Sequence, residues 1–293
     1  MGAVILDGKK LAAEMRADIA AKVAELKRDF GITPGLGVIL VGANPASISY
    51  VTAKEKACTE AGMYSEDIRL PEEATQDDVV AIVRRMNLDP KIHGILVQLP
   101  LPKGIDESAV ISAISPEKDV DGFTPENVGR MVIGEQSFLP CTPHGVIKLL
   151  ERAGVETSGR HVVVVGRSNI VGKPVAQLLM RKAPGCNATV TVCHTATPDL
   201  SVFTRQADIL VVAAGHPNTV TADMVKPGVA VIDVGVNRIP DPTRSRGYRL
   251  SGDVDFDAVS KIASVITPVP GGVGPMTITM LLYNTLASAQ RSK

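Results

Sequence analysis

The chain has 293 residues, of which 45% are hydrophobic and 21% are charged, the balance of a globular protein that can bury a substantial core. Basic and acidic residues number 31 each, aromatic residues make up only 3%, and tryptophan is absent, so neither net charge nor stacking platforms favour a nucleic-acid partner. The four cysteines form no CxxC pair, and no apolar run reaches the ~18 residues of a membrane span. We therefore expect a soluble, cytoplasmic protein with reduced thiols and with no membrane or nucleic-acid partner.

Regular spacing of apolar residues in the first half of the chain predicts alternating helices and strands. Between Asp7 and Phe30 the large apolar side chains recur at steps of three and four residues, which places them on one face of a helix that Asp7 can cap. Thr75 and Asp78 have the spacing of a capping box. The expected elements are a helix over 7–30, a strand over 35–42, a helix over 45–61, a strand near Ile68, a helix from 75 and a strand over 92–99.

The second half of the chain continues this alternation. Thr142 and Pro143 are typical of the N-cap and first turn of a helix, and Pro275 opens the last helix. The segment 241–249 is expected to be a solvated loop. The expected elements are a helix over 142–153, a strand over 161–165, a helix over 173–182, strands over 189–194, 208–215 and 229–236, and a helix over 275–289.

Alternating strands and helices of this kind predict an α/β protein with mostly parallel sheets. We expect an N-terminal α/β catalytic domain over 1–145, with the C-terminal helix 275–293 packing back on it. The remainder, 146–274, is expected to form a Rossmann-like, doubly wound parallel sheet that binds a dinucleotide.

The segment from Gly166 to Pro174 lies between an expected strand and an expected helix. Backbone N–H groups at such a turn point outward beside the positive end of the helix dipole, and glycine lets a phosphate approach closely. A Walker A loop is excluded, because five residues instead of four separate Gly166 from Gly172 and because proline stands in place of the Ser or Thr that binds magnesium. The standard GxGxxG pattern is also absent, so these residues fit either a dinucleotide phosphate loop or a plain strand-to-helix turn.

The end of the following strand bears on the choice of cofactor. NAD sites usually carry Asp or Glu there, which binds the ribose 2′-hydroxyl. This strand instead ends in Cys193, His194 and Thr195, with no carboxylate to repel a 2′-phosphate. Arg167 offers that phosphate a bidentate cation, although it could equally be an exposed loop side chain. We therefore predict NADP as the cofactor.

Tyr50 and Lys54 lie four residues apart in an expected helix, so their side chains share one face. A lysine whose pKa is lowered by burial can act as a general acid or base near neutral pH. The alternative is a solvated helix face formed by Lys54, Glu55 and Lys56.

Polar residues also follow the buried strand that ends near position 99. Gln98 lies at its carboxyl end, where α/β sheets place their ligands, or is a satisfied strand-end amide. Asp119 and Asp121 are either paired carboxylates or turn formers before Gly122. The five histidines show no metal-ligand spacing and no GxSxG elbow occurs, so no metal site is expected.

Five segments together closely resemble the methylenetetrahydrofolate dehydrogenase/cyclohydrolase family, in the family's order and over nearly the whole chain. They are Tyr50–Lys56 (YVTAKEK), Val97–Pro102 (VQLPLP), Lys118–Phe123 (KDVDGF), Gly166–Pro174 (GRSNIVGKP) and Pro268–Thr277 (PVPGGVGPMT). The resemblance implies a homodimer with a folate-binding cleft between two domains. It further implies oxidation of 5,10-methylenetetrahydrofolate with NADP, followed by hydrolysis of the methenyl product to 10-formyltetrahydrofolate.

The resemblance also implies a role for each candidate residue. Lys54 would be the general acid/base of the hydrolytic step, oriented by Gln98 and assisted by Tyr50, which would pack on the folate. Asp121, grouped with these catalytic residues, would bind the amino-pyrimidine edge of the pterin. The implied folate-binding residues are Tyr50, Val97, Gln98, Leu99, Asp121, Pro270, Gly271 and Gly274. The implied NADP-binding residues are Gly166, Arg167, Ser168, Ile170, Val171, Thr195 and Val236.

Two other functions stay open at this point. A monofunctional NAD(P)-dependent dehydrogenase of related two-domain fold would act on another small substrate, and the PGGVGP segment, Gln98 and Asp121 argue against it. A non-catalytic NADP-binding sensor would keep the Gly166 loop but would need neither Lys54 nor Gln98.

Overall fold

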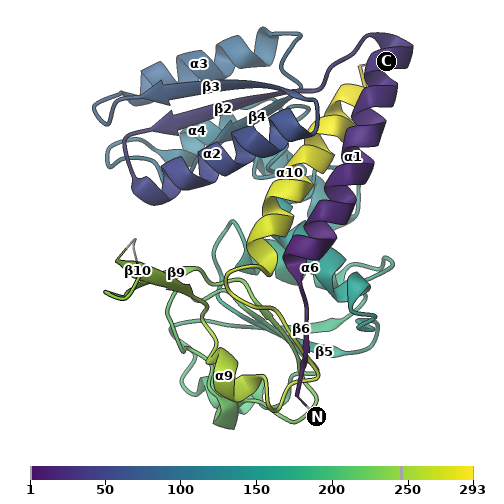
Figure 1. Ribbon diagram of the computed structural model, residues 1–293, viewed down its shortest axis with the longest axis vertical. Coiled ribbons are helices and arrows are strands. Elements are labelled where there is room, and N and C mark those ends of the chain that lie inside the picture. The colour runs from purple at the N-terminus through teal and green to yellow at the C-terminus, as the bar shows by residue number, and fades with distance from the viewer. Residues whose placement is uncertain (1, 245–246, 293) are drawn as a thin grey trace. The chain divides into compact units, whose positions relative to one another are not determined.

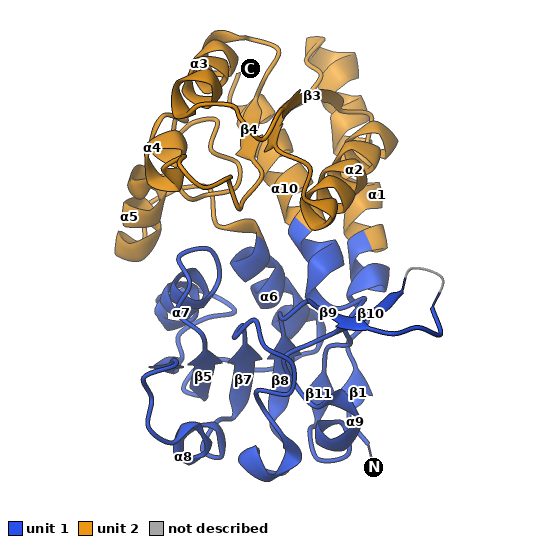
Figure 2. Cartoon of the chain, turned by 90° about the vertical axis from the view of Figure 1, so that its left-hand side faces the viewer, with its two compact units in different colours: residues 1–12, 142–277 blue, residues 13–141, 278–293 orange. Residues whose placement is uncertain are grey.

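The computed structural model describes residues 2–244 and 247–292, and the chain forms two compact units (Figure 2). Unit 1 comprises residues 1–12 and 142–277, and unit 2 comprises residues 13–141 and 278–293. The boundaries fall inside three helices, α1 (Gly8–Phe30), α6 (Cys141–Arg152) and α10 (Val273–Gln290). The predicted α/β fold class is confirmed, and the domain limits expected from the sequence stay a prediction.

Unit 2 is built on a three-stranded parallel sheet in the order β3-β2-β4. The register places Ile39 of the central strand opposite Ile68 on one side and Val97 on the other. The elements of this unit, besides parts of α1 and α10, are β2 (Gly35–Val41), α2 (Pro45–Glu60), β3 (Tyr64–Leu70), α3 (Gln76–Leu88), β4 (Gly94–Val97), α4 (Glu107–Ser112) and α5 (Pro125–Ile133).

Helices cover both faces of this sheet (Figures 1 and 2). On one face, Ile39 and Val97 pack with Val83 and Met86 of α3 and Val110 of α4 in one buried cluster. On the other side lie α2 and the second part of α10. Because both faces are covered, β2 and β4 are apolar throughout rather than alternating, as the glycine-bounded run predicted, whereas the edge strand β3 carries polar residues.

Unit 1 contains a six-stranded parallel sheet in the order β1-β11-β8-β7-β5-β6 (Figure 2). The chain winds from β5 to β6 on one side and then returns to β7 on the other side of β5. This reversal is the switch point at which doubly wound sheets bind their ligands. The elements of this unit, besides α6 and parts of α1 and α10, are β1 (Val4–Ile5), β5 (His161–Val165), α7 (Gly172–Met180), β6 (Thr189–Cys193), α8 (Leu200–Thr204), β7 (Ile209–Val212), the 3-10 helix η1 (Ala222–Met224), β8 (Ala230–Asp233), β9 (Asn237–Pro240), β10 (Tyr248–Ser251), α9 (Phe256–Val259) and β11 (Val265–Ile266).

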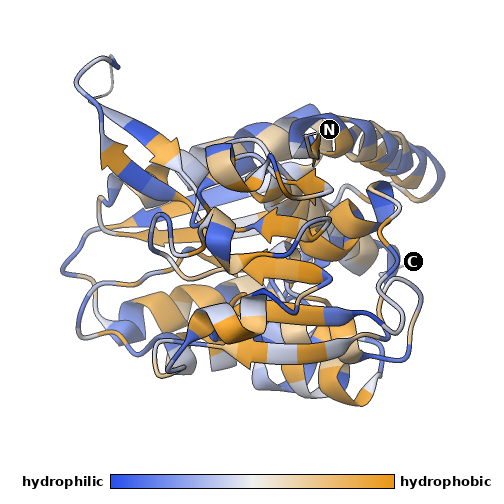
Figure 3. Ribbon diagram, turned by 90° about the horizontal axis from the view of Figure 1, so that it is seen from below, coloured by the Kyte–Doolittle hydropathy of each residue, from blue (hydrophilic) through white to orange (hydrophobic). Residues whose placement is uncertain are grey.

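The strands of unit 1 form its apolar core, which is visible as hydrophobic ribbon bounded by hydrophilic loops in Figure 3. Val163, Leu210 and Val231 are fully buried on three neighbouring strands. The four cysteines are free thiols and all are buried. Among the described helices, none combines the length and hydropathy that crossing a bilayer requires.

Local capping agrees with the sequence-based expectations at two helices. The backbone N–H of Lys10 donates to Asp7 Oδ1 at 3.0 Å at the start of α1. At α3, Asp78 N donates to Thr75 Oγ1 at 3.2 Å while Thr75 N donates to Asp78 Oδ2 at 2.9 Å, which completes the capping box.

Several expected boundaries are wrong, and the strands expected over 208–215 and 229–236 end earlier, at Val212 and Asp233. Thr142 is not an N-cap: α6 begins at Cys141, and the Thr142 hydroxyl instead pairs with Thr277 Oγ1 at 2.9 Å. The last helix begins at Val273 rather than Pro275, since proline is tolerated anywhere in a first turn, where its missing N–H has no helical partner. The strand expected over 92–99 is shortened to β4 (Gly94–Val97), although the N–H of His93 still donates to the Gly35 carbonyl of β2; proline after Leu99 cannot donate to the ladder.

The expected loop 241–249 is also partly wrong. Tyr248 begins a strand, β10 (Tyr248–Ser251), which pairs antiparallel with β9 (Asn237–Pro240). The guanidinium of Arg238 lies 4.8 Å from the ring centroid of Tyr248, a contact that stabilises the pairing. Positions 245 and 246 of that predicted loop lie outside the described residues.

The second part of α10 returns to unit 2, as expected for the C-terminal helix. Asn284 Nδ2 donates to the carbonyl oxygens of Val120 at 2.8 Å and Leu139 at 3.0 Å. Ser288 Oγ donates to the Glu117 carbonyl at 3.0 Å. These bonds fix the segment on either side of Asp121 to α10.

Candidate functional site

Lys54 lies on the buried face of α2. The helix begins after Asn44, whose side-chain oxygen accepts from the N–H of Ala46 at 2.9 Å, and Pro45 occupies its first turn. Its buried residues recur at helical spacing, and Lys54 is one of them with only 7% of its surface exposed. A solvated helix face is therefore excluded for Lys54. Tyr50, one turn earlier, remains 37% exposed.

Gln98 holds the ammonium end of Lys54. Its backbone N–H donates to the Ile39 carbonyl at 2.9 Å, so the residue continues the pairing of β4 with β2. Its side-chain Nε2 donates to the Leu99 carbonyl at 2.7 Å, which leaves Oε1 to accept from Lys54 Nζ at 3.0 Å. Both ends of the amide are thus used, and the direction in which Oε1 points is fixed.

Electrostatic coupling links Lys54 with Asp121. Burial lowers the pKa of the Lys54 ammonium, and the negative charge of Asp121 opposes that shift. Burial likewise raises the pKa of Asp121, which Lys54 opposes and Asp119 reinforces. Each pKa is shifted in the direction that favours the neutral form of its group. A proton can therefore move to or from this pair at modest cost in free energy.

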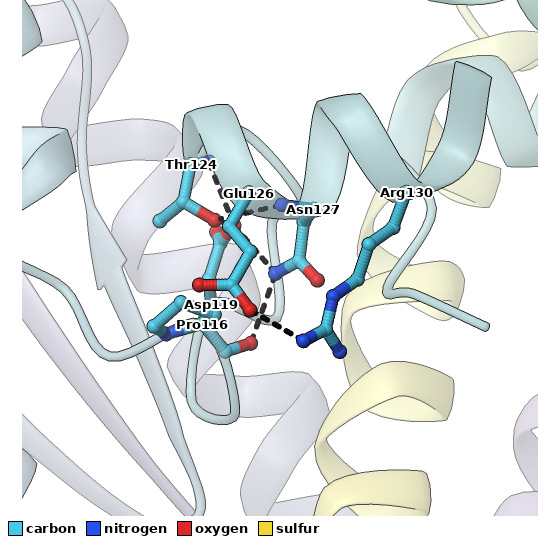
Figure 4. Close-up of polar contacts among 6 residues, drawn as sticks. All are labelled: Pro116, Asp119, Thr124, Glu126, Asn127 and Arg130. Carbon is cyan, nitrogen blue, oxygen red and sulfur yellow. Dashed lines mark hydrogen bonds and ion pairs between the residues drawn. The ribbon is translucent and has the colours of Figure 1, made fainter. Parts of the chain in front are cut away.

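Asp119 has a different role from Asp121, although the two are separated by a single residue. Its Oδ1 accepts from the N–H of Gly122 at 2.9 Å. Its Oδ2 accepts from Thr124 N at 2.8 Å and Asn127 Nδ2 at 2.9 Å (Figure 4). With 1% of its surface exposed, Asp119 orders the turn that leads into α5. Of the two sequence-based interpretations, Asp119 follows the turn-forming one, whereas Asp121 faces the Lys54 cluster.

Cys141 is a member of this cluster that sequence reasoning missed. Its Sγ donates to the Val120 carbonyl at 3.3 Å, and burial raises its pKa well above the usual thiol range. The thiol contacts Asp121 and stays protonated there. Only the three-dimensional fold brings it to Lys54, because no spacing motif links the two positions.

The Gly166 loop follows β5 at the switch point of the unit 1 sheet. Gly166 has φ +116, and a Cβ there would collide with the Ala213 carbonyl, so only glycine fits. Ser168 Oγ accepts from the N–H groups of Val171 at 3.2 Å and Gly172 at 3.4 Å, which shapes the loop before α7. Within the described chain, no protein group accepts from the N–H groups of 167–170, and these residues are exposed.

This loop fits the diphosphate of a dinucleotide. Its outward N–H groups lie next to the N-terminus of α7, where the helix dipole favours an anion. The exposed Arg167 side chain adds a cation, and residues 194–198 directly after β6, including the exposed Thr195, present no carboxylate. Val236, predicted near the nicotinamide, follows β8 at the same edge of the sheet and is 44% exposed.

The remaining predicted folate residues divide between the two units. Val97 and Leu99 flank Gln98 in unit 2, with Val97 buried and Leu99 partly exposed. Pro270, Gly271 and Gly274 belong to unit 1, where Gly271 accepts from the N–H of Lys9 at 3.1 Å. The structure thus assembles Lys54, Gln98 and Asp121 within one unit and the Gly166 loop within the other. Among the described residues, no group of three or more His, Cys, Asp or Glu side chains is placed to hold a metal ion.

Comparison with known proteins identifies both halves of the chain. Residues 6–121 match the family model for the tetrahydrofolate dehydrogenase/cyclohydrolase catalytic domain, and residues 140–293 match that for the NAD(P)-binding domain. The chain is 56% identical over 289 residues to the bifunctional protein FolD of Chlorobium phaeobacteroides, covering 98% of each chain.

Solved structures agree with this match. The bifunctional FolD methylenetetrahydrofolate dehydrogenase/cyclohydrolase of Campylobacter jejuni is 49% identical and superposes with a TM-score of 0.93 over 99% of each chain. The Trypanosoma brucei methylenetetrahydrofolate dehydrogenase-cyclohydrolase complexed with NADP and an inhibitor is 45% identical, with a TM-score of 0.95 over 100% of this chain and 99% of that one. The chain therefore belongs to the tetrahydrofolate dehydrogenase/cyclohydrolase family.

Proposed function

We propose that this chain catalyses two consecutive reactions of folate one-carbon chemistry. It oxidises 5,10-methylenetetrahydrofolate to the methenyl form with NADP, and it hydrolyses that product to 10-formyltetrahydrofolate. Family membership supports both activities, since relatives matching over nearly the full chain are named bifunctional. The observation that carries the hydrolytic half is the buried Lys54 ammonium bonded to Gln98 and coupled to Asp121.

NADP, when bound, supplies the acceptor for a hydride from the methylene carbon. The chain's contribution to this step is positioning, because the hydride moves directly and no side chain needs to carry a proton. Arg167 binds the 2′-phosphate, and residues 194–198 directly after β6 carry no carboxylate that would repel this phosphate. The other residues assigned to NADP are Gly166, Ser168, Ile170, Val171, Thr195 and Val236.

Hydrolysis requires proton transfer at two points. Water that adds to the methenyl carbon gives up two protons overall, one to N5 as its bond to carbon breaks and one to solvent. Lys54, with its pKa lowered by burial, accepts a proton from the water in its neutral form and returns one to N5. Gln98 Oε1 holds Nζ in place throughout, because it accepts a hydrogen bond from either form of the amine.

Folate is recognised by residues around this group. Asp121 binds the amino-pyrimidine edge of the pterin, for which a carboxyl group is the natural partner. Tyr50 packs on the pterin from the same face of α2 as Lys54 and assists the hydrolytic step. The other residues assigned to the folate are Val97, Leu99, Pro270, Gly271 and Gly274.

The chain is further proposed to form a homodimer in the cytoplasm, as the family resemblance implies. Size-exclusion chromatography with light scattering tests the assembly. A mass near twice 30.8 kDa supports a dimer, and a mass near 30.8 kDa contradicts it.

Product analysis tests the proposed function directly. Purified protein is incubated with methylenetetrahydrofolate and NADP, and the products are separated by chromatography. NADPH together with 10-formyltetrahydrofolate, formed faster than in a protein-free control, is the expected result. Accumulation of the methenyl compound alone would indicate a monofunctional dehydrogenase, and the absence of turnover would indicate a non-catalytic NADP-binding protein.

A further inference from the structure

Two buried aspartates lie at the ligand edge of the unit 1 sheet, outside the five segments that carry the family resemblance. Asp233 is the last residue of β8, and Asp253 follows β10. They are 3% and 0% exposed, respectively, so neither side chain can contact a ligand through its own surface. Burying two carboxylates is costly unless N–H donors satisfy them.

Asp253 binds the loop that follows β7. Its Oδ2 accepts from the backbone N–H groups of Ala214 at 2.7 Å and Gly215 at 2.8 Å. Its Oδ1 accepts from Asn237 Nδ2 at 2.7 Å, at the start of β9. One carboxylate therefore joins the segment after β7 to the segment after β8.

Asp233 accepts hydrogen bonds from the backbone of two segments, the one after β8 and the one around Asp253. Its Oδ1 accepts from the N–H groups of Gly235 and Asp253, both at 3.0 Å, and its Oδ2 accepts from that of Val254 at 3.0 Å. Burial raises its pKa to about 6 despite these bonds. We call Asp233, Asp253 and Asn237 the carboxylate brace.

Two glycines allow the backbone to approach the carboxylates of the brace closely. A Cβ at Gly235 would collide with the Asp253 carboxylate, and a Cβ at Gly252 would collide with that of Asp233. The backbone of each of these two segments thus lies directly against the carboxylate carried by the other. Such close fitting leaves little freedom to the chain that leaves β7 and β8.

The brace acts on the segments that surround the cofactor site. The Ala213 carbonyl lies against Gly166 of the phosphate loop, and Ala213 immediately precedes the two N–H groups held by Asp253. Val236, assigned to the nicotinamide end, lies between Gly235, whose N–H donates to Asp233, and Asn237, whose side chain donates to Asp253. A shift of Asp253 would therefore be transmitted to both ends of the dinucleotide site.

We propose that Asp253, supported by Asp233 and Asn237, is a positioning residue that sets the affinity of the NADP site without touching the cofactor. This inference rests on the proposed NADP-dependent function. It predicts a specific effect on NADP binding that general loss of stability would not produce.

Asp253→Asn is the sharpest test, because it keeps the shape and replaces one acceptor by a donor. An asparagine can still accept from Ala214 and Gly215, but its amide nitrogen then opposes Asn237 Nδ2, donor against donor. Asp208→Asn is the matched control. Asp208 accepts from His161 N at 2.9 Å and pairs with Lys226 at 2.6 Å, at the opposite edge of the same sheet.

Three measurements are made on the full-length protein and both variants: the NADP dissociation constant by titration calorimetry, KM and kcat of the dehydrogenase, and the rate of methenyl hydrolysis. For Asp253→Asn we expect the dissociation constant and KM for NADP to rise about tenfold or more, with hydrolysis retained. Asp208→Asn is expected to lower the melting temperature while leaving NADP affinity unchanged.

Each outcome decides the inference. Wild-type affinity in Asp253→Asn, or equal weakening in both variants, overturns it while the proposed function stands. A wild-type protein that neither binds NADP nor oxidises folate overturns both. If Asp253→Asn fails to fold, Asn237→Ser replaces it: a smaller rise in the NADP dissociation constant supports the inference, and an unchanged one overturns it.

Discussion

Replacement of Lys54 by methionine separates the two proposed activities. Methionine keeps most of the length and the apolar stem of the side chain but removes the only atom of Lys54 that can carry a proton. General acid–base catalysis typically contributes about 10²–10⁴-fold to a rate, or about 3–5 kcal/mol of transition-state free energy. We expect hydrolysis to fall by that factor. The dehydrogenase should keep much of its rate, because hydride transfer uses no proton carrier.

The structure also predicts that this variant folds. Loss of Nζ leaves Gln98 Oε1 without the donor that lies 3.0 Å away, which costs about 1–3 kcal/mol. Removing the ammonium group of a residue that is only 7% exposed offsets part of this cost. The expected change in the free energy of unfolding is therefore small beside the loss of hydrolysis.

The assay follows the absorbance of the methenyl compound, first as it is hydrolysed and then as it forms together with NADPH. Lys56→Met is the matched control: it lies on the same helix, is exposed, and its 3.7 Å pair with Glu60 contributes little. Hydrolysis at the wild-type rate in Lys54→Met would remove Lys54 from the mechanism. An equal loss of both activities would show that Lys54 shapes the site rather than transferring protons.

Further predictions concern binding, pH, stability and thiol reactivity. Arg167→Ala should weaken NADP binding about 10–100-fold more than NAD binding in calorimetry, and equal losses would show that Arg167 does not bind the 2′-phosphate. Because neutral Lys54 is the active base, hydrolysis should rise with pH through its lowered pKa, and a pH–rate profile of Lys54→Met should lack that rise. Asp119→Ala should lower the free energy of unfolding in urea by about 2–4 kcal/mol, whereas Glu126→Ala, which breaks only a surface pair with Arg130, should change it by less than about 1 kcal/mol. Burial raises the pKa of Cys58 to about 12, so iodoacetamide should modify this thiol only after unfolding, and rapid labelling of native protein would contradict its burial.

Hydrophobic periodicity sufficed to predict the alternation of helices and strands. The apolar runs of β2, β5 and β7 are short and bounded by glycine or polar residues, and buried parallel strands need that pattern. The hairpin of β9 and β10 escaped prediction because its polar, arginine-rich sequence resembles a loop. Its pairing depends on contacts such as that of Arg238 with Tyr248, which no local pattern encodes.

Side-chain roles in the candidate site were harder to predict than the elements that carry them. Helical spacing places Tyr50 and Lys54 on one face of α2, but it does not say whether that face is turned inward. The motif that contains Asp119 and Asp121 likewise leaves both residues equivalent. Only the turn before α5 distinguishes them, because it aims the N–H groups of Gly122 and Thr124 at Asp119.

Buried ionisable groups in this protein are stabilised in two physically distinct ways. For Asp119 and Asp253, amide N–H donors replace lost water, and the carboxylate serves to hold a loop. For Lys54 and Asp121, burial lowers the pKa of the amine and raises the pKa of the carboxyl group. Both shifts favour the neutral form, which lowers the free-energy cost of moving a proton. Asp233 combines both features, since it accepts three backbone N–H bonds and still has a pKa of about 6. Substitution of a carboxylate that binds loops is therefore expected to disturb the geometry of those loops. Substitution of a group that exchanges protons is expected to lower the reaction rate instead.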